Sequence, residues 1–144
     1  MKKNISVKIG YLAIFMIALT AAGRAWAEPV FVIGPKVSLT SISKETAEGI
    51  LKGKVKTWAS GQRIDLVVLS GGPIHSAILS KCTNLDSDQF STQWERLIFT
   101  GKATKPKAFA SDAELLKYVA ASDFALGYAD SSSVGGDVKT LKIE

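Results

Sequence analysis

The stretch Ile64-Asp-Leu-Val-Val-Leu69, followed by Ser70-Gly-Gly-Pro73, decides the fold of this chain. A short apolar run closed by glycine and proline is typical of a strand that is covered on both faces. Proline is favoured in the first turn of a helix, because its missing N–H would be unpaired there in any case. The stretch therefore predicts a buried strand, a tight turn, and a helix from Pro73 to about Lys81.

Upstream of this stretch, the sequence predicts one more strand and one more helix. Val30-Phe-Val-Ile33 is a second apolar run, and Gly34-Pro35 closes it. Ser43 is a good N-cap, since its hydroxyl can accept a hydrogen bond from an unpaired amide of the first turn. Ala47, Ile50 and Leu51 then share one helical face, and Gly53 is a plausible stop.

Downstream, a helix is predicted from about Asp86 to Gly101. Asp86 and Gln89 have the spacing of a capping box. Phe90, Trp94, Leu97 and Ile98 follow at helical spacing, and we interpret this stripe as a core face.

The last third of the chain predicts a helix and two strands. Ser111 and Glu114 form a second capping box. Strands are expected over Phe124–Tyr128 and Val138–Ile143, the latter as an edge or terminal strand. Residues 102–108, with the basic stretch Lys102–Lys107, are predicted to be a mobile solvated loop. The order β-α-β-α-α-α-β-β indicates an α/β fold with a central sheet flanked by helices.

The first 27 residues have the three parts of a secretion signal. Lys2, Lys3 and Lys8 precede the apolar run Tyr11–Leu19, and Ala25-Trp-Ala27 is a small-x-small cleavage site. A spanning helix needs about 20 apolar residues, so a membrane anchor is the weaker alternative. We expect a signal peptide over residues 1–27, a single α/β domain over 28–144, and export to the periplasm.

Charge and chemistry exclude several functions. Four of the 18 basic residues lie in residues 1–27, so 14 face 13 acidic residues in the rest of the chain. Nucleic-acid binding, which needs a clustered basic face, is not expected. Cys82 is the single cysteine and His75 the single histidine, so no disulfide within the chain, no multi-histidine metal site and no cofactor are expected. We interpret Cys82 as a buried small hydrophobe, with an intermolecular disulfide as the alternative. We expect no enzymatic activity.

Three segments carry a resemblance to a known family. They are Ser43–Lys54 with Trp58 and Gly61, Trp94–Lys102 with Pro106, and Ala113–Tyr128. In this order they resemble the periplasmic substrate-binding proteins of phosphate-type ABC transporters, and more closely the short single-domain relatives of that group. The resemblance implies a single lobe of a type II periplasmic-binding-protein-like (PBP-like) fold.

The same resemblance directs attention to the turn after the central strand. Family members bind an oxyanion between two lobes, partly through an Arg, three spacer residues and Ser-Gly-Thr. Here Ser70 and Gly71 match, whereas Leu66 and Gly72 stand at the Arg and Thr positions. Amides at a helix N-terminus attract anions, so Ser70, Gly71, Gly72 and His75 are candidate ligand-binding residues. A plain strand-to-helix turn is the alternative.

A second hydroxyl-rich segment precedes the first helix. Ser41 and Ser43, together with Ser38 and Thr40, are further candidates for contacting an oxyanion. The alternative is that they cap the helix and solvate the loop.

These features predict a periplasmic domain that binds a small anion, such as phosphate, without changing it. An ABC transporter permease, a porin or a sensor is the expected protein partner, and pairing with a second copy would build a fuller cleft. The alternative function is an envelope interaction or sensory module that binds no ion.

Overall fold

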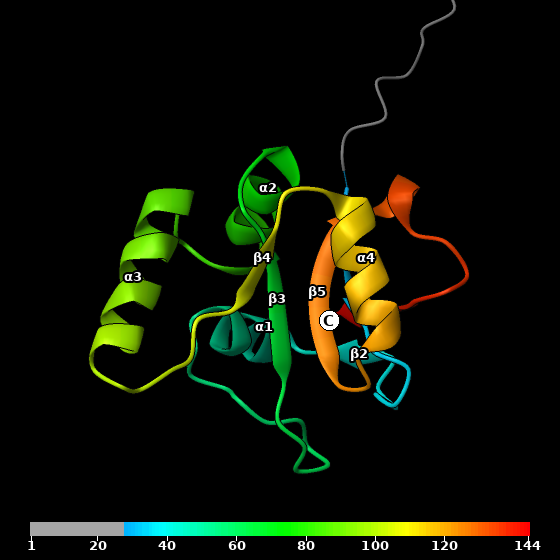
Figure 1. Ribbon diagram of the computed structural model, residues 1–144, viewed down its shortest axis with the longest axis horizontal. Helices are drawn as coiled ribbons and strands as arrows, with labels where there is room; N and C mark the ends of the chain where they lie inside the picture. Colours follow the sequence, from blue (N-terminus) through cyan, green and yellow to red (C-terminus); the bar gives the residue numbers. More distant parts are fainter. Residues whose placement is uncertain (1–27) are drawn as a thin grey trace, which may run out of the picture.

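The computed structural model describes residues 28–144 as one α/β unit (Figure 1). The predicted signal peptide, residues 1–27, lies outside the described residues. The elements in chain order are β1 (Pro29–Ile33), β2 (Ser41–Ile42), α1 (Lys44–Leu51), β3 (Asp65–Leu69), α2 (Pro73–Cys82), α3 (Ser87–Phe99), β4 (Lys107–Phe109), α4 (Asp112–Ala121), β5 (Ala125–Asp130), the short 3-10 helix η1 (Ser131–Ser133) and β6 (Lys139–Ile143).

The six strands form one sheet in the order β2-β6-β1-β5-β3-β4. Strand β1 is antiparallel to both of its neighbours, β5 and β6, while the pairs β2–β6, β3–β5 and β3–β4 are parallel. Five strands therefore run in one direction. Their carboxyl ends lie along one edge of the sheet, where α1, α2 and α4 begin after β2, β3 and β4.

Helices cover both faces of this sheet, and β5 shows why. Successive side chains of a strand point to opposite faces. Gly127 faces α4 so closely that a Cβ there would lie 2.8 Å from the side chain of Leu115. Tyr128 points to the other face and contacts His75 of α2. Figure 1 shows α4 across the front of β5 and α1 behind β3, which gives three layers.

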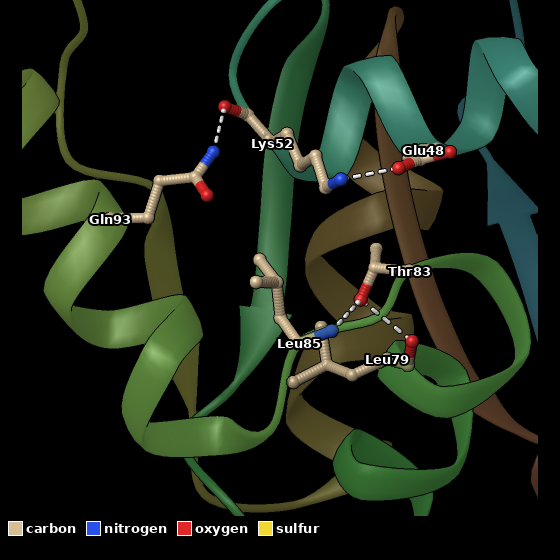
Figure 2. Close-up of polar contacts among 6 residues, drawn as sticks. All are labelled: Glu48, Lys52, Leu79, Thr83, Leu85 and Gln93. Atoms are coloured by element: carbon tan, nitrogen blue, oxygen red, sulfur yellow. Dashed lines mark hydrogen bonds and ion pairs between the residues drawn. The ribbon is translucent and has the colours of Figure 1, made fainter.

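Helix α3 is held to the rest of the molecule by hydrogen bonds from its side chains. The indole of Trp94 donates to the carbonyl of Leu51 at 2.8 Å, and the amide of Gln93 donates to the carbonyl of Lys52 at 3.0 Å (Figure 2). Thr83 shapes the turn between α2 and α3, because its hydroxyl donates to the Leu79 carbonyl and accepts from the Leu85 amide. These contacts fix the position of α3 relative to the sheet.

Several sequence predictions are confirmed. Asp86 caps α3 with both bonds of a capping box. The second predicted capping box is confirmed in one bond, from the Glu114 amide to the Ser111 hydroxyl, and the described residues do not show the return bond from the Glu114 side chain. Cys82 is buried, and burial raises the pKa of its thiol. The resulting neutral, enclosed side chain is that of a small hydrophobe.

Other predictions are wrong. Residues 107–109 are not part of a mobile loop but form β4, which pairs with β3. The last strand is not at an edge, because the two-residue strand β2 pairs with β6 on its outer side. Ile98 was placed on the core face of α3, yet it is exposed, since α3 contacts the molecule mainly through its first two turns.

Candidate functional site

The turn after β3 lies at the carboxyl edge of the sheet, where ligands bind in open α/β folds. The Ser70 amide donates to the Phe109 carbonyl of β4 at 2.9 Å, which fixes the start of the turn. Ser70, Gly71 and Gly72 are all exposed. The ten-residue helix α2 follows directly, with Gly72 as its N-cap and Pro73 in its first turn.

The backbone of this turn is open to approach. A Cβ built on Gly71 or Gly72 would meet no atom within 4 Å. Gly72 has a φ of 93°, a left-handed conformation that favours glycine. A threonine at this position would be strained, so the departure from the family's Ser-Gly-Thr agrees with the local backbone. The turn therefore lacks the threonine hydroxyl, but its backbone is accessible to a ligand.

His75 lies beneath the turn, in a buried hydrogen-bond network. Its side chain is only 4% exposed, and its Nδ1 lies 2.5 Å from the hydroxyl of Tyr128. That hydroxyl accepts a hydrogen bond from the Leu69 amide at 3.2 Å. Of the two partners of the Tyr128 hydroxyl, only His75 Nδ1 can accept its proton. The arrangement that leaves no buried proton unpaired therefore has Nδ1 as the acceptor and the imidazole proton on Nε2. His75 can therefore offer one N–H donor on the side away from Tyr128.

Burial keeps both members of this network neutral. It lowers the pKa of His75, and it raises the pKa of the Tyr128 phenol well above its usual range. The network therefore supplies a neutral hydrogen-bond donor near the turn and no positive charge.

Ser70 and His75 line one groove of about 470 Å³ between α3 and the β3–β4 edge. Apolar side chains form most of its wall, among them Phe90, Trp94 and Phe99. Its charged lining residues are Glu95 and Lys105. Lys105 was not among the predicted site residues, because residues 102–108 were expected to form a solvated loop. The pairing of β4 with β3 brings this segment to the groove.

The structure does not bring the two groups of predicted site residues together. Strand β2 lies four strand spacings from β3, so Ser43 is about 19 Å from Ser70. Ser43 caps α1 by accepting from the Thr46 amide, and the Ser41 hydroxyl donates to Glu144 at 2.6 Å. The capping alternative therefore describes Ser43, whereas Ser41 bonds the carboxylate of Glu144. A phosphate-sized ion cannot contact both groups of predicted residues at once.

Acidic groups stand beside the turn. Asp130 ends β5, the neighbour of β3, and its amide donates to the carboxylate of Asp112 at 3.0 Å. Arg63 lies at the opposite end of β3, and Arg96 lies in the last turn of α3. An anion at the turn therefore meets amides and neutral donors, and Lys105 is the cation that lines the same groove.

Solved structures supply the comparison. No family model matches the sequence, and no curated protein is similar to it. The fold is similar to an ABC-type phosphate transport receptor from Vibrio cholerae, with 17% identity, a TM-score of 0.55, and coverage of 80% of this chain and 45% of that one. It is also similar to a putative phosphate ABC transporter substrate-binding protein with bound phosphate from Clostridium perfringens, with 14% identity, a TM-score of 0.64, and coverage of 80% and 44%. PstS from Borrelia burgdorferi has 16% identity, a TM-score of 0.61, and coverage of 81% and 47%.

The chain has the fold of one lobe of these binding proteins. This lobe spans less than half the length of each of the three solved structures. Within residues 28–144, the lobe contains no cluster of three or more histidine, cysteine or acidic residues suited to a metal ion. None of its helices in that range has the length and apolar character needed to cross a membrane.

Proposed function

We propose that the protein is a periplasmic binding lobe that holds a small oxyanion of the phosphate class at the turn Ser70–His75, without chemistry on the ligand. The observation that carries the proposal is the open Ser70–Gly72 turn at the carboxyl end of β3. The similarity to phosphate-binding structures supports the choice of ligand class. Residues 1–27 would direct export and be removed.

The donors of the turn itself are neutral, and Lys105 lines the groove that Ser70 and His75 share. The amides of the first turn of α2 have no partners within the helix, and the positive end of the helix dipole lies behind them. The Ser70 hydroxyl adds a donor from the turn. His75 Nε2 can add another from beneath, through the groove that both residues line. Because Leu66 replaces the family's Arg, we expect binding that is weak and shared among several oxyanions.

Thermal unfolding with and without ligand tests this function. A ligand that binds only the folded state stabilises it by about 2.7 kcal/mol at a hundredfold excess over Kd. We expect phosphate or sulfate to raise the melting temperature at constant ionic strength.

The protein is expressed as the full chain, and mass spectrometry identifies its N-terminus. We expect the mass of a chain that begins at Glu28. The mass of a chain that begins at Met1 would contradict the proposed export.

Two matched variants locate the effect. Gly71→Asp places a carboxylate on the open turn, while Gly135→Asp adds the same charge at an equally open glycine in the loop before β6. Neither glycine has the left-handed φ that a side chain would strain. The proposal expects Gly71→Asp to abolish the anion-dependent shift and Gly135→Asp to retain it. Equal shifts in both variants would place the ion elsewhere.

A second function, contact with another envelope protein, is favoured by one observation. Phe99 is 92% exposed at the end of α3, beside Ile98 and the apolar groove. A permease, a porin, a sensor or a second copy of the chain could cover these side chains. If Phe99→Ser abolishes co-purification of a specific envelope protein that the unaltered chain retains, this function gains support; a partner retained equally by both counts against it.

A further inference from the structure

A second pocket, of about 400 Å³, lies at the amino end of β3 and shares Trp94, Lys105 and Pro106 with the groove beside α3. The loop between α1 and β3 forms one side of it, and the segment before β4 forms the other. Its basic lining residues are Lys56, Arg63, Lys105 and Lys107. Since β3 rises by about 3.3 Å per residue, Asp65 at the start of the strand lies roughly 17 Å from Ser70.

The positive charge of this pocket is not neutralised within the described chain. Residues 28–144 contain two ion pairs, Lys36–Asp123 and Lys52–Glu48, and neither involves the pocket. Lys56 instead donates to the Lys102 carbonyl.

Two further basic side chains of the pocket, Arg63 and Lys107, also donate hydrogen bonds to neutral oxygen atoms. Arg63 donates to the Thr104 hydroxyl at 3.4 Å, and Lys107 donates to the Tyr118 hydroxyl at 3.0 Å. The carboxylate among the lining residues, Asp65, accepts hydrogen bonds from Tyr118 and Ser122. Both bonds go to Asp65 Oδ2, and the carboxylate also attracts Lys107. One carboxylate faces four basic side chains, so the lining keeps a net positive charge.

The remaining lining is mainly apolar. The residues concerned are Ile50, Val55, Ile64, Leu66, Trp94 and Pro106. Leu66 stands where the resemblance implies an arginine, and it contributes an apolar surface to this pocket. A pocket of this volume is in the range of small-molecule sites, which combine apolar walls with a few polar groups that orient the ligand.

We propose that this pocket binds a small amphipathic anion, an apolar body of about ten heavy atoms that carries a carboxylate or sulfonate. Burial of the apolar body against Trp94 and Leu66 supplies affinity, and Arg63 and Lys56 hold the charged group at the rim. A bare inorganic ion would leave the apolar walls in water. A neutral apolar ligand would leave the cations without a partner.

The probe for this site is 1-anilinonaphthalene-8-sulfonate, which combines an aromatic body with one sulfonate and fluoresces in apolar surroundings. It is titrated into the purified protein, expressed as the full chain, and binding is read from its fluorescence. We expect saturable binding that octanoate displaces and octanol, at the same concentration, displaces much less. Displacement by both to the same extent would contradict a role for the basic rim.

Charge variants test the location. Lys56→Gln with Arg63→Gln should weaken binding of the probe at least about tenfold, since each charged contact contributes about fivefold. Lys117→Gln with Lys142→Gln removes the same charge from exposed positions outside the pocket and should leave the affinity within about twofold. Near-ultraviolet circular dichroism checks that both double variants keep the fold.

Two further arms separate this site from the others. Phe99→Ser alters the groove beside α3, and Gly71→Asp alters the Ser70 turn; both should bind the probe as the unaltered protein does. If Phe99→Ser abolishes binding while the Lys56 and Arg63 variant retains it, the probe occupies the groove and the inference is wrong. Inorganic phosphate at matched ionic strength should not displace the probe, whatever its own effect on melting temperature.

Discussion

The two ends of β3 present opposite chemistry. At its carboxyl end, the Ser70 turn offers open backbone amides and a neutral buried His75, with Asp112 and Asp130 nearby. At its amino end, a pocket with apolar walls carries four basic side chains. We propose the first end as the oxyanion site, yet most of the local positive charge lies at the second.

Under both proposals, the two ends would favour an anion by different means. Helix-terminal amides favour an anion through fixed dipoles that need no ionised side chain. Lysines and arginines favour it through mobile, salt-screened charge. The carboxyl end rests on a buried network that the fold needs, whereas the amino end is exposed and tolerates change. Removal of single groups at each end measures that contrast.

The largest contrast is expected on truncation of a tyrosine at each end. Tyr128→Ala at the carboxyl end removes a fully buried ring and should lower the free energy of unfolding by about 4 kcal/mol. Tyr118→Ala at the amino end removes a half-buried ring and should cost about 1 kcal/mol. Urea unfolding measures both, and similar losses would remove the contrast.

Deletion of the hydroxyl groups alone sharpens the comparison. Tyr128→Phe leaves the Leu69 amide and His75 Nδ1 without a partner in a buried setting, which should cost about 2 kcal/mol. Tyr118→Phe frees Asp65 and Lys107 where water can replace the bond, so its cost should stay below about 1 kcal/mol. Both losses of free energy are obtained from the midpoints of urea unfolding, provided that the dependence on urea concentration has the same slope. A larger loss for Tyr118→Phe than for Tyr128→Phe would contradict the view that the carboxyl end contributes more to stability.

The buried His75 at the carboxyl end should also make the stability of the fold depend on pH. Burial lowers the pKa of His75, so the unfolded chain binds a proton more readily than the folded one near pH 6. The stability that comes from a neutral His75 is complete above about pH 6.5 and is lost as the pH falls from there through the lower folded pKa. Between about pH 7.5 and 5.5 we expect a loss of about 1 kcal/mol.

His75→Asn provides the control for this pH dependence. Asparagine keeps a polar side chain at the position and does not titrate. Urea unfolding of the variant should show a flatter pH profile over the same interval. A variant profile as steep as that of the unaltered protein would assign the titration to another group.

The smallest effect is expected at the amino end. Lys107 is exposed, and its hydrogen bond to Tyr118 raises the pKa of its ammonium group. Lys107→Met keeps most of the side-chain length and should change the free energy of unfolding by no more than about 0.5 kcal/mol. A loss above about 1 kcal/mol, measured by thermal unfolding, would show that this end also contributes to the stability of the fold.

The elements that sequence reasoning located are those whose signals are local. The apolar run of β3, Pro73 at the start of α2 and the capping box at Asp86 each act within a few residues. Strands β2 and β4 were missed because two or three residues show no periodicity, and only pairing with β6 and β3 holds them extended.

The candidate site was also predictable only where its signals are local in the sequence. The Ser70–Gly72 turn follows from its own composition and the strand before it. The order of the sheet, which separates Ser43 from Ser70, depends on long-range pairing. So do the burial of His75 against Tyr128, 53 residues away, and the gathering of Lys56, Arg63 and Lys105 at one pocket.

Binding of an oxyanion at the Ser70 turn can be measured from amide resonances during a phosphate titration of ¹⁵N-labelled protein. We expect saturable shifts of the Gly71, Gly72 and Ile74 amides, with little change at Arg63 and Lys56. Saturable shifts confined to the amino end of β3, or no saturable shift at the turn, would contradict it.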